Sequence, residues 1–477
     1  MPKHTDFYIN GQWVAPIRPR DLPVIDPSTE EVCATISLGE PEDTDAAVAA
    51  ANAAFEGWAT TDPAERIAAV ERLLEVYKAR AEDMAQAISH EMGAPIDLAR
   101  AQQVGAGSWN MEGFLRAARD FRWEYPLGDW APGERVLHEP VGVCALITPW
   151  NWPMNQIVLK VVPALLTGCT MVLKPSEIAP LSGLVFAEIV DEAGIPAGVF
   201  NLVNGDGPGV GSTLSAHPDV DMVSFTGSTR AGRLISKAAA DTIKRVSLEL
   251  GGKGANIIFA DAAEKAVKSG VIRCFRNTGQ SCNAPSRMLV ERSRYDEAVE
   301  QAAAAAQGVA VGPSDEEGRH IGPAVSEAQF DKIQSLIQTG IDEGARLVAG
   351  GPGRPETLNR GYYVRPTVFA DVTPEMTIYR EEIFGPVLSI LPFEDEAHAV
   401  RIANDTEYGL TNFIQTTDHD KLRRVARRLR SGMVEGNGRG FGQGSPFGGY
   451  KQSGNGREGG IFGLHEFLET KAVSDWG

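Results

Sequence analysis

Between Val141 and Leu250 the chain alternates short apolar strands with helices, and this alternation constrains the fold more than any other feature of the sequence. The strand-like runs are Val141–Thr148, Thr170–Leu173, Val199–Val203, Met222–Phe225 and Arg245–Leu250. The helical patterns between them are Asn155–Thr167, Leu181–Ala193, a segment after Gly209, and Ser228–Ala240. Strands that alternate with helices form βαβ units, whose strands lie parallel in a sheet covered by helices on both faces. The sequence therefore predicts a doubly wound α/β fold.

The flanking segments extend this pattern on both sides. A second α/β pattern begins at Ala255–Phe259 and continues through a helix to Phe275, the strand Met288–Glu291 and further strands and helices to about Gly432. Helices are expected ahead of the first sheet at Thr44–Trp58, after Pro63, at Glu82–Glu91 and at Ile96–Arg119. The segment Phe121–Val141 is aromatic, alternating and interrupted by Pro and Gly, which predicts an extended arm or hairpin. This segment is either an arm that serves assembly or a simple surface hairpin.

Size and charge exclude several classes of protein. A chain of 477 residues is too long for one ordinary core, so two or three domains are expected. Its net charge of −18 argues against nucleic acid or an anionic membrane as a partner. The longest apolar runs, around Val141–Ile147 and Ile157–Leu166, are too short to span a bilayer. Five cysteines without a CxxC pattern, and an N-terminus without an apolar signal region, predict a cytoplasmic protein.

One cysteine stands in a different setting from the other four. Cys282 lies in Asn277–Arg287 among small and hydrogen-bonding residues, in a loop that can present a thiol to a ligand. A free thiol is only slightly ionised near neutral pH, so its surroundings must activate it. The other four cysteines lie in or beside apolar strands or at a helix end, where a cysteine is normally a small buried hydrophobe. Cys282 is therefore the candidate nucleophile.

Three segments after predicted strands are candidates for a dinucleotide site. Gly205–Gly211 carries alternating glycines that do not match G-x-G-x-x-G, and we interpret it as a turn. Phe225–Thr229 places a glycine and Ser/Thr at a helix N-terminus, which suits a pyrophosphate, although Ser and Thr are also ordinary helix caps. In Lys174–Glu177 the lysine and the glutamate are spaced to bind ribose hydroxyls, unless the segment is simply a solvated turn.

Two further side chains complete a possible catalytic set. Glu249 ends an apolar strand, where a carboxylate is either held structurally or acts as a base with a raised pKa. Asn151 lies between two tryptophans and two prolines, so its amide is rigidly placed to donate to an oxyanion. Together with Cys282 these residues permit chemistry through an acylated thiol.

The motifs taken together closely resemble the NAD(P)-dependent aldehyde dehydrogenase superfamily over almost the whole chain. In order along the chain, the matching motifs are Pro149-Trp150-Asn151, Lys174-Pro175-Ser176-Glu177, Phe225-Thr226-Gly227-Ser228-Thr229, Glu249-Leu250-Gly251-Gly252-Lys253, Gly279-Gln280-Ser281-Cys282, Glu382-Ile383-Phe384-Gly385-Pro386 and Pro446-Phe447-Gly448-Gly449. Each motif is modest alone, and their shared order makes a chance match negligible.

The resemblance implies three structural parts. They are a Rossmann-like NAD-binding domain at 1–120 and 141–251, an α/β catalytic domain at 252–448, and a small β oligomerisation arm with the C-terminal segment at 121–140 and 449–477. The arm implies a homodimer or homotetramer.

The resemblance also implies the reaction and its residues. Cys282 attacks the aldehyde, Asn151 and the N–H of Cys282 hold the oxyanion, hydride passes to NAD, and Glu249 activates the water that hydrolyses the thioester. Glu177 would repel a 2′-phosphate, which favours NAD over NADP, and no metal is required. The implied cofactor residues are Thr148, Pro149, Trp150, Lys174, Ser176, Glu177, Gly207, Gly211, Phe225, Thr226, Gly227, Ser228, Leu250, Gly251, Glu382 and Phe384.

The substrate is the least determined feature. The resemblance implies an aldehyde tunnel lined by Trp152, Gln156, Leu159, Arg276, Ser281, Asn283 and Phe447. The loop Gly436–Gly444 has few bulky side chains, which predicts a roomy tunnel for a bulky, aromatic or medium-chain aldehyde. Arg276 and Arg439 make a carboxylate-bearing semialdehyde the rival substrate. A CoA-acylating dehydrogenase, a thiol esterase and a non-catalytic NAD-binding protein are the remaining alternatives; the intact Glu249 argues against the first, and the complete set of dinucleotide residues against the other two.

Overall fold

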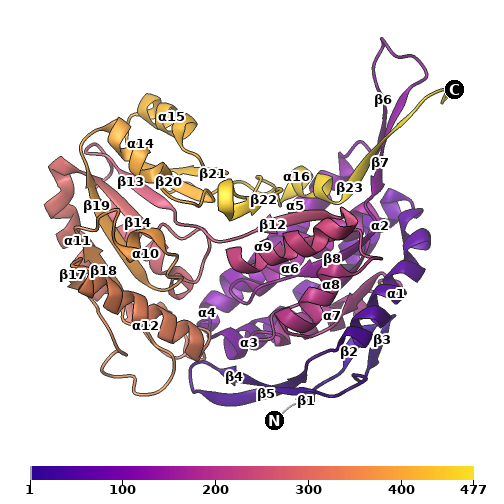
Figure 1. Cartoon of the computed structure of the whole chain (residues 1–477), viewed down its shortest axis with the longest axis horizontal. Helices are drawn as coiled ribbons and strands as arrows, with labels where there is room; N and C mark the ends of the chain where they lie inside the picture. The colour runs from indigo at the N-terminus through magenta and orange to yellow at the C-terminus, as the bar shows by residue number, and fades with distance from the viewer. Residues whose placement is uncertain (1–2, 477) are drawn as a thin grey trace.

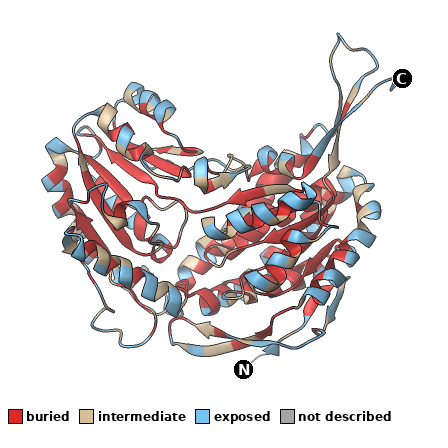
Figure 2. Cartoon of the chain, in the orientation of Figure 1, coloured by how far each residue is buried: buried red, intermediate tan, exposed pale blue. Residues whose placement is uncertain are grey.

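The structure, a computed structural model, describes residues 3–476 and contains two large sheets in two lobes, with an arm that projects from one of them (Figure 1). Each large sheet is buried between helices, and exposed residues gather on the outer helical faces (Figure 2). The buried apolar residues form separate clusters on the two faces of each sheet. This arrangement is the one that near-continuous apolar strands require, because both of their faces must be covered.

The first sheet has eight strands. Their spatial order is β22 (Gly454–Asn455), β12 (Arg245–Glu249), β11 (Met222–Thr226), β8 (Val143–Ile147), β9 (Thr170–Lys174), β10 (Phe200–Leu202), β2 (Phe7–Ile9) and β3 (Gln12–Val14). The five central strands, β12 to β10, run parallel, while β22, β2 and β3 join antiparallel. The chain leaves β8 in both directions, so the topological switch point lies between β8 and β11. Ligands of doubly wound folds bind beyond the strand ends at such a point.

Helices cover this sheet on both faces and connect its strands. They are α1 (Pro41–Ala59), α2 (Pro63–Ala79), α3 (Ala81–Met92), α4 (Ile96–Leu98), α5 (Gly105–Arg119), α6 (Pro153–Thr167), α7 (Leu181–Glu192), α8 (Ser212–Ala216) and α9 (Thr229–Ala239). Between α4 and α5 the helix continues as a π-helical segment, Ala99–Val104. The predicted helix Ile96–Arg119 is therefore confirmed as one continuous helical stretch with an irregular turn inside it.

Two sequence predictions in this region are wrong in detail. Gly205–Gly211 is not a turn, because Gly207–Gly211 form a π-helical turn that leads into α8, and the Asp206 carboxylate caps it by accepting from Gly209 N at 2.6 Å. The strand predicted to begin at Val141 begins at Val143, because Gly142 adopts a φ of 130°. A side chain there would meet the Asp221 carboxylate, which accepts a hydrogen bond from Val143 N at 2.8 Å.

The second sheet has seven strands. Their spatial order is β17 (Arg346–Ala349), β18 (Thr367–Ala370), β19 (Val387–Phe393), β14 (Arg287–Glu291), β13 (Ala255–Ile258), β20 (Thr411–Gln415) and β21 (Met433–Gly436), all parallel except the β17–β18 pair. The helices of this lobe are α10 (Ala266–Phe275), α11 (Tyr295–Gln307), α12 (Glu327–Asp342), α13 (Thr377–Arg380), α14 (Glu396–Asn404) and α15 (His419–Arg428). Only residues 250–254 separate β12 from β13, so the carboxyl edge of the first sheet faces the amino edge of the second.

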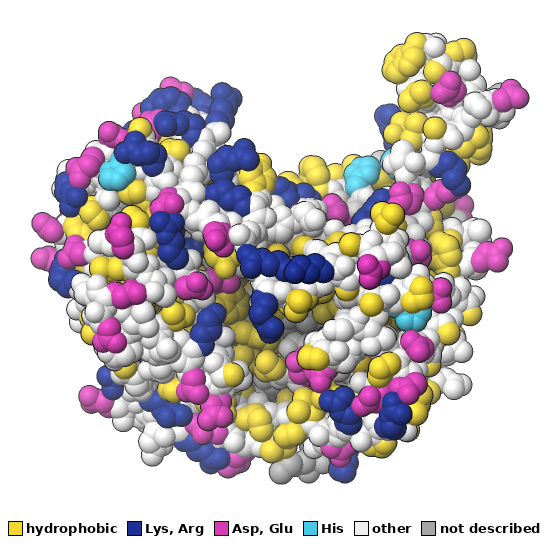
Figure 3. All heavy atoms as spheres, viewed as in Figure 1, with side chains coloured by type: hydrophobic (Ala, Val, Ile, Leu, Met, Phe, Trp, Pro, Cys, Tyr) yellow, Lys and Arg dark blue, Asp and Glu magenta, His cyan; other side chains and the backbone are white. Residues whose placement is uncertain are grey.

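The remaining strands form small sheets. The arm sheet pairs β7 (Arg135–Pro140) with β6 (Glu124–Pro126) and with β23 (Leu468–Val473), which follows α16 (Gly460–Glu466). The predicted hairpin is thus confirmed, and hydrophobic side chains gather at its tip (Figure 3), where Trp130 is 80% exposed. The other small sheets are β1 (Lys3–His4) with β5 (Glu31–Ser37) and β4 (Asp21–Asp26), and β15 (Ala310–Val311) with β16 (His320–Ile321). Within residues 3–476 the structure holds no helix with the length and hydropathy of a membrane span.

Candidate active site

The three proposed catalytic residues lie where the two lobes meet. Asn151 follows β8 and Glu249 ends β12, both at the carboxyl edge of the first sheet, whereas Cys282 lies in the loop between α10 and β14 at the amino edge of the second. A Cβ atom added to Gly252 would lie 2.2 Å from the carbonyl oxygen of Cys282, so only glycine permits this approach. The short connector after β12 therefore brings the cysteine loop against the strand that carries Glu249.

The thiol of Cys282 is not activated by its loop alone. Cys282 is half-buried, and burial raises the pKa of its thiol well above the usual range. The carboxylates of Glu382 and Glu249 raise this pKa further, while the N–H of Asn283 lowers it. The thiol is thus protonated at neutral pH in this structure, and its ionisation requires a base or a nearby positive charge.

The Asn151 side chain is fixed on the cysteine loop. Its Nδ2 donates to the carbonyl oxygen of Gln280 at 2.9 Å, two residues before Cys282. An amide nitrogen carries two hydrogens, so one remains for a substrate oxygen. Trp152 is tied to the same loop, because its Nε1 donates to Ser281 Oγ at 2.8 Å.

Glu249 is a buried carboxylate without a hydrogen-bond partner. Its side chain is 2% exposed, and neither oxygen has a partner within residues 3–476. Burial raises the pKa of Glu249 well above its ordinary value, and the Glu458 carboxylate raises it further, whereas Lys160 opposes this shift. An unpaired buried carboxylate with a raised pKa is suited to accept a proton from a water molecule.

Two buried charges next to Glu249 were not anticipated from the sequence. Lys160 of α6 is 1% exposed and forms an ion pair with Glu458, and its Nζ also donates to Thr226 Oγ1 at 2.7 Å. Thr226 and Glu249 are register partners on β11 and β12, so the pair lies beside the carboxylate. A lone lysine within the apolar run Ile157–Leu166 was the signal available in the sequence, because charged residues are buried only when they are paired.

The predicted tunnel residues surround one cavity of about 410 Å³ that also contains Cys282. All seven lie on its wall, and they are Trp152, Gln156, Leu159, Arg276, Ser281, Asn283 and Phe447. Trp109 and Phe441 also line it and are 43% and 41% exposed, so the entrance is aromatic. Small-molecule pockets measure about 300–1,000 Å³, so this cavity is modest in size rather than roomy.

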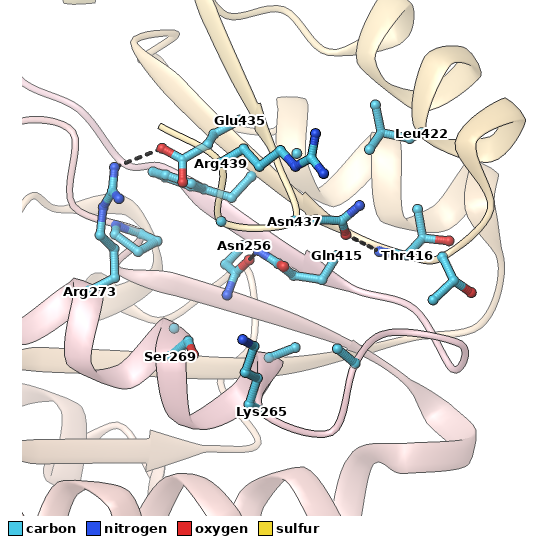
Figure 4. Close-up of a pocket in the computed structure, with 18 of the residues that line it drawn as sticks. Asn256, Lys265, Ser269, Arg273, Gln415, Thr416, Leu422, Glu435, Asn437 and Arg439 are labelled. Atoms are coloured by element: carbon cyan, nitrogen blue, oxygen red, sulfur yellow. Dashed lines mark hydrogen bonds and ion pairs between the residues drawn. The ribbon is translucent and has the colours of Figure 1, made fainter. Parts of the chain in front are cut away.

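Of the two arginines considered as carboxylate ligands, Arg276 lines the cavity of Cys282 and Arg439 does not. Arg276 lines the cavity that contains Cys282, and within residues 3–476 its guanidinium forms no hydrogen bond or ion pair. Arg439 instead lines a neighbouring cavity of about 850 Å³ between α10 and the strand ends of β20 and β21 (Figure 4). In that cavity Arg273 is already paired with Glu435 at 2.8 Å. Arg273 and Arg276 line both cavities, so Arg276 is the arginine in the cavity of Cys282 that has no partner within residues 3–476.

The proposed cofactor residues lie at or after the ends of strands β8, β9, β10, β11 and β12, or in the loop that precedes β19. Ser228 caps α9 by accepting from Ala231 N at 3.2 Å, and the free N–H groups of a helix N-terminus bind phosphate. Lys174 and Glu177 lie 3.3 Å apart, with the lysine also donating to the carbonyl oxygens of Pro175 and Gly205. Gly211 lies beside Lys174, whose side-chain carbons would be 3.9 Å from a Cβ atom there.

The loop before β19 completes this group. Glu382 accepts from Gly252 N at 2.8 Å, and a Cβ atom added to Gly251 would lie 2.5 Å from the other Glu382 oxygen. Burial raises the pKa of Glu382 to about 7. Phe384 packs edge-on against Trp150 with ring centroids 5.4 Å apart. A helix N-terminus, glycines that admit a close approach and a carboxylate for hydroxyl groups fit a dinucleotide.

The remaining residues of the implied set have structural contacts. Thr148 N donates to the Lys174 carbonyl at 3.1 Å, and Ser176 Oγ accepts from Ile178 N at 3.3 Å. Gly227 N donates to the Glu249 carbonyl at 3.0 Å, which ties the end of β11 to that of β12. Leu250 N donates to the Ser453 carbonyl at 2.9 Å. Pro149, Phe225 and Gly207 lie in the segments described above.

Comparison with known proteins gives a consistent result. The model of the aldehyde dehydrogenase family matches residues 13–473. A 3-succinoylsemialdehyde-pyridine dehydrogenase from a Pseudomonas species is 53% identical over 478 residues, which cover 99% of each chain. Among solved structures, an aldehyde dehydrogenase from Bartonella henselae superposes with a TM-score of 0.99 and 61% identity, covering 100% of both chains. A variant of aldehyde dehydrogenase C from Pseudomonas syringae, complexed with NAD+ and octanal, gives a TM-score of 0.97 and 50% identity, covering 99% of this chain and 97% of that one.

Proposed function

The chain belongs to the aldehyde dehydrogenase family, and on this premise we propose that it oxidises a medium-chain or aromatic aldehyde to the carboxylic acid with NAD. The observation that carries the proposal is the cavity of about 410 Å³ that joins Cys282 to an apolar, aromatic wall. NAD+ and octanal are bound together in the related P. syringae enzyme. The volume and the aromatic entrance suit an aldehyde of similar size.

In the proposed reaction Cys282 adds to the carbonyl carbon while its thiol proton passes to solvent water. The carbonyl oxygen then becomes an oxyanion that accepts from the free N–H of Asn151 and from the N–H of Cys282. When bound, the nicotinamide supplies the hydride acceptor. Loss of hydride from the cysteine adduct leaves a thioester on Cys282. Addition of sulfur must come first, because hydride departs readily only from an alkoxide-like centre.

Hydrolysis of the thioester is assigned to Glu249. Its unpaired oxygens take a proton from water as the water attacks the thioester carbon, and the carboxylic acid and the thiol are released. The paired charges of Lys160 and Glu458 lie next to this carboxylate and set its affinity for the proton. We assign the nucleotide to the residues at or after the ends of β8, β9, β10, β11 and β12 and before β19, with Glu177 selecting NAD over NADP.

The assembly and the compartment are further proposals. The exposed apolar tip of the arm supports a homodimer or homotetramer. All five cysteines are free, and a thiol nucleophile needs reducing conditions, which favours the cytoplasm.

The proposal is tested by following the absorbance of the reduced cofactor with a panel of aliphatic, aromatic and ω-carboxy aldehydes, each with NAD or NADP. Oxidation of octanal or benzaldehyde with NAD at a kcat/KM of at least about 10⁴ M⁻¹s⁻¹ is expected. Short aldehydes that react much faster than both would contradict the assignment of substrate size. A strict requirement for CoA would contradict hydrolysis as the final step.

A semialdehyde with a terminal carboxylate is the second candidate, and the unpaired Arg276 in the cavity favours it. Arg276→Gln is expected to raise the KM for ω-carboxy aldehydes about tenfold, because a hydrogen bond to a charged group is lost, while the KM for octanal changes less than about twofold. Arg439→Gln is the matched control, because Arg439 faces the neighbouring cavity (Figure 4). Equal effects of Arg276→Gln on both substrates would exclude a carboxylate contact.

A further inference from the structure

The π-helical segment Ala99–Val104 brings a buried amide towards the active site. Such segments are rare, and they often occur at functional sites because they displace one residue from the regular helical register. Gln103, near the end of this segment, is completely buried. The segment is held from the other side by Tyr77, whose hydroxyl donates to the carbonyl oxygen of Val104 at 2.8 Å.

Gln103 contacts the backbone of the proposed oxyanion residue. Its Nε2 donates to the carbonyl oxygen of Asn151 at 3.0 Å and to Asn277 Oδ1 at 3.3 Å. Its own Oε1 has no hydrogen-bond partner within residues 3–476. A buried carbonyl oxygen without a partner destabilises the fold, so the stability of the helix alone does not account for a glutamine here.

Asn277 closes the network from the side of the cysteine loop. Its backbone adopts a φ of 53°, and its Nδ2 donates to the carbonyl oxygen of Asn151 at 2.8 Å and to that of Gln280 at 3.3 Å. The carbonyl of Asn151 thus receives two amide donors from two different lobes. The side chain of Asn151 in turn donates to the carbonyl oxygen of Gln280, so hydrogen bonds in both directions hold the loop of Cys282 against the loop of Asn151.

This network fixes the direction of the remaining Asn151 N–H. Two donors on one carbonyl hold the peptide plane, and the bond to Gln280 holds the side-chain amide, so no reorganisation is needed when charge develops on a substrate oxygen. A misplacement of about 1 Å in such a donor lowers the rate about 10²-fold. Neither Gln103 nor Asn277 lines the cavity of Cys282, so each acts only through Asn151 and the loop.

We propose that Gln103 is a positioning residue for the oxyanion site, acting through the carbonyl of Asn151 together with Asn277. This inference rests on the role of Asn151 in the proposed function. It makes the π-helical segment of the first lobe a determinant of acylation rate, although none of the residues 99–104 lines the cavity of Cys282.

The test is a double-mutant cycle between positions 103 and 151. Gln103→Met keeps the length of the side chain and removes its donors, and we expect it to lower the rate of acylation at least about tenfold. The dissociation constant for NAD and the KM for NAD should stay within about twofold, since the nucleotide residues are not touched. In the background of Asn151→Ala the same change should cost less than about twofold, because the backbone carbonyl remains but the side-chain donor that it positions is gone. Equal losses in both backgrounds would overturn the proposal.

Acylation is measured in two ways so that the two proposals fail differently. One readout is the burst of reduced cofactor with octanal, and the other is the burst of nitrophenolate from p-nitrophenyl acetate, which needs the oxyanion site but no aldehyde. If nitrophenolate is released without any aldehyde oxidation, the proposed function fails while the inference is still tested. If Gln103→Met leaves both bursts unchanged, the inference fails alone.

Two further variants separate positioning from folding. Asn277→Gly removes the other donor while keeping the left-handed backbone that glycine accepts, and it should reproduce the loss of acylation rate. Asn201→Leu removes a completely buried amide that bonds Met171 and Gly198 in β9 and before β10, remote from the cysteine loop. It should lower the melting temperature without slowing either burst. A loss of acylation in Asn201→Leu that matches its loss of stability would assign the effect of Gln103 to folding.

Discussion

Replacing Cys282 by alanine is expected to lower the rate of aldehyde oxidation at least about 10⁴-fold, because a covalent mechanism without its nucleophile retains only the contributions of binding and the oxyanion site. The thiol lies on the wall of the cavity of about 410 Å³, so its loss also enlarges that cavity slightly and leaves room for the aldehyde. The dissociation constant for NAD should be unchanged within about twofold, because the proposed nucleotide residues keep their contacts. Steady-state formation of reduced cofactor and a fluorescence titration with NAD measure the two effects.

The matched control is Cys33→Ala, which removes a half-buried cysteine of β5 whose Sγ contacts the Val24 carbonyl at 3.4 Å. It should retain the wild-type rate within about twofold, since this thiol lies outside the active site. Residual oxidation by Cys282→Ala above roughly 1% of the wild-type rate would place the nucleophile elsewhere.

Replacing Glu249 by glutamine is expected to block hydrolysis while leaving the first turnover intact. Loss of a general base lowers the steady-state kcat by about 10²–10⁴-fold, whereas the thiol still adds to the aldehyde and still yields a thioester. A single burst of reduced cofactor, one equivalent per site, should therefore be followed by a very low steady-state rate. Mass spectrometry of the quenched enzyme should find the acyl group on the peptide that contains Cys282. Absence of the burst would show that Glu249 acts before acylation.

The pH dependence follows from the direction of the Glu249 pKa. A base works in its ionised form, and burial raises this pKa, so the hydrolysis-limited rate should rise with pH through the raised value and lose this limb in Glu249→Gln. Glu458→Gln removes a like charge from Glu249 and leaves Lys160 uncompensated, and both changes lower the pKa. The ascending limb should then move to lower pH. A shift in the opposite direction would contradict the electrostatic assignment.

The sequence predicts the parallel strands well because their signal is local. Runs such as Met222–Phe225 and Arg245–Leu250 are short, carry apolar residues at alternate positions and are bounded by turn residues, and the observed strands begin and end within two residues of them. The exceptions arise where a single side-chain contact determines the local backbone conformation. Gly142 takes a left-handed conformation because of Asp221, and the Asp206 cap turns a glycine-rich segment into a helical turn. Neither contact is visible in a hydrophobic pattern.

The site residues that belong to sequence motifs could be predicted, whereas the contacts between residues far apart in the sequence could not. The seven tunnel residues came from resemblance, and the structure places them on one cavity wall. The contacts of Lys160 with Glu458 and of Gln103 with Asn151 join segments separated by 298 and 48 residues, so no local pattern encodes them. The same holds for the Cys282 thiol, whose pKa is raised by carboxylates of three different segments.

The order in which the chain is synthesised sets when the enzyme becomes complete. β23, near the end of the chain, pairs with β7 of the arm, and β22 pairs with β12 directly at Glu249. A ribosome adds about 5–20 residues per second, so roughly 20–70 s separate the emergence of Pro140 from that of Val473. Until these segments emerge, the β7 edge that faces away from β6 and the outer edge of β12 have no strand partner on the nascent chain. Both edges are covered only after Gly454–Asn455 and Leu468–Val473 have been synthesised, so a chain truncated before Gly454 carries the thiol but lacks both the finished site and a finished arm.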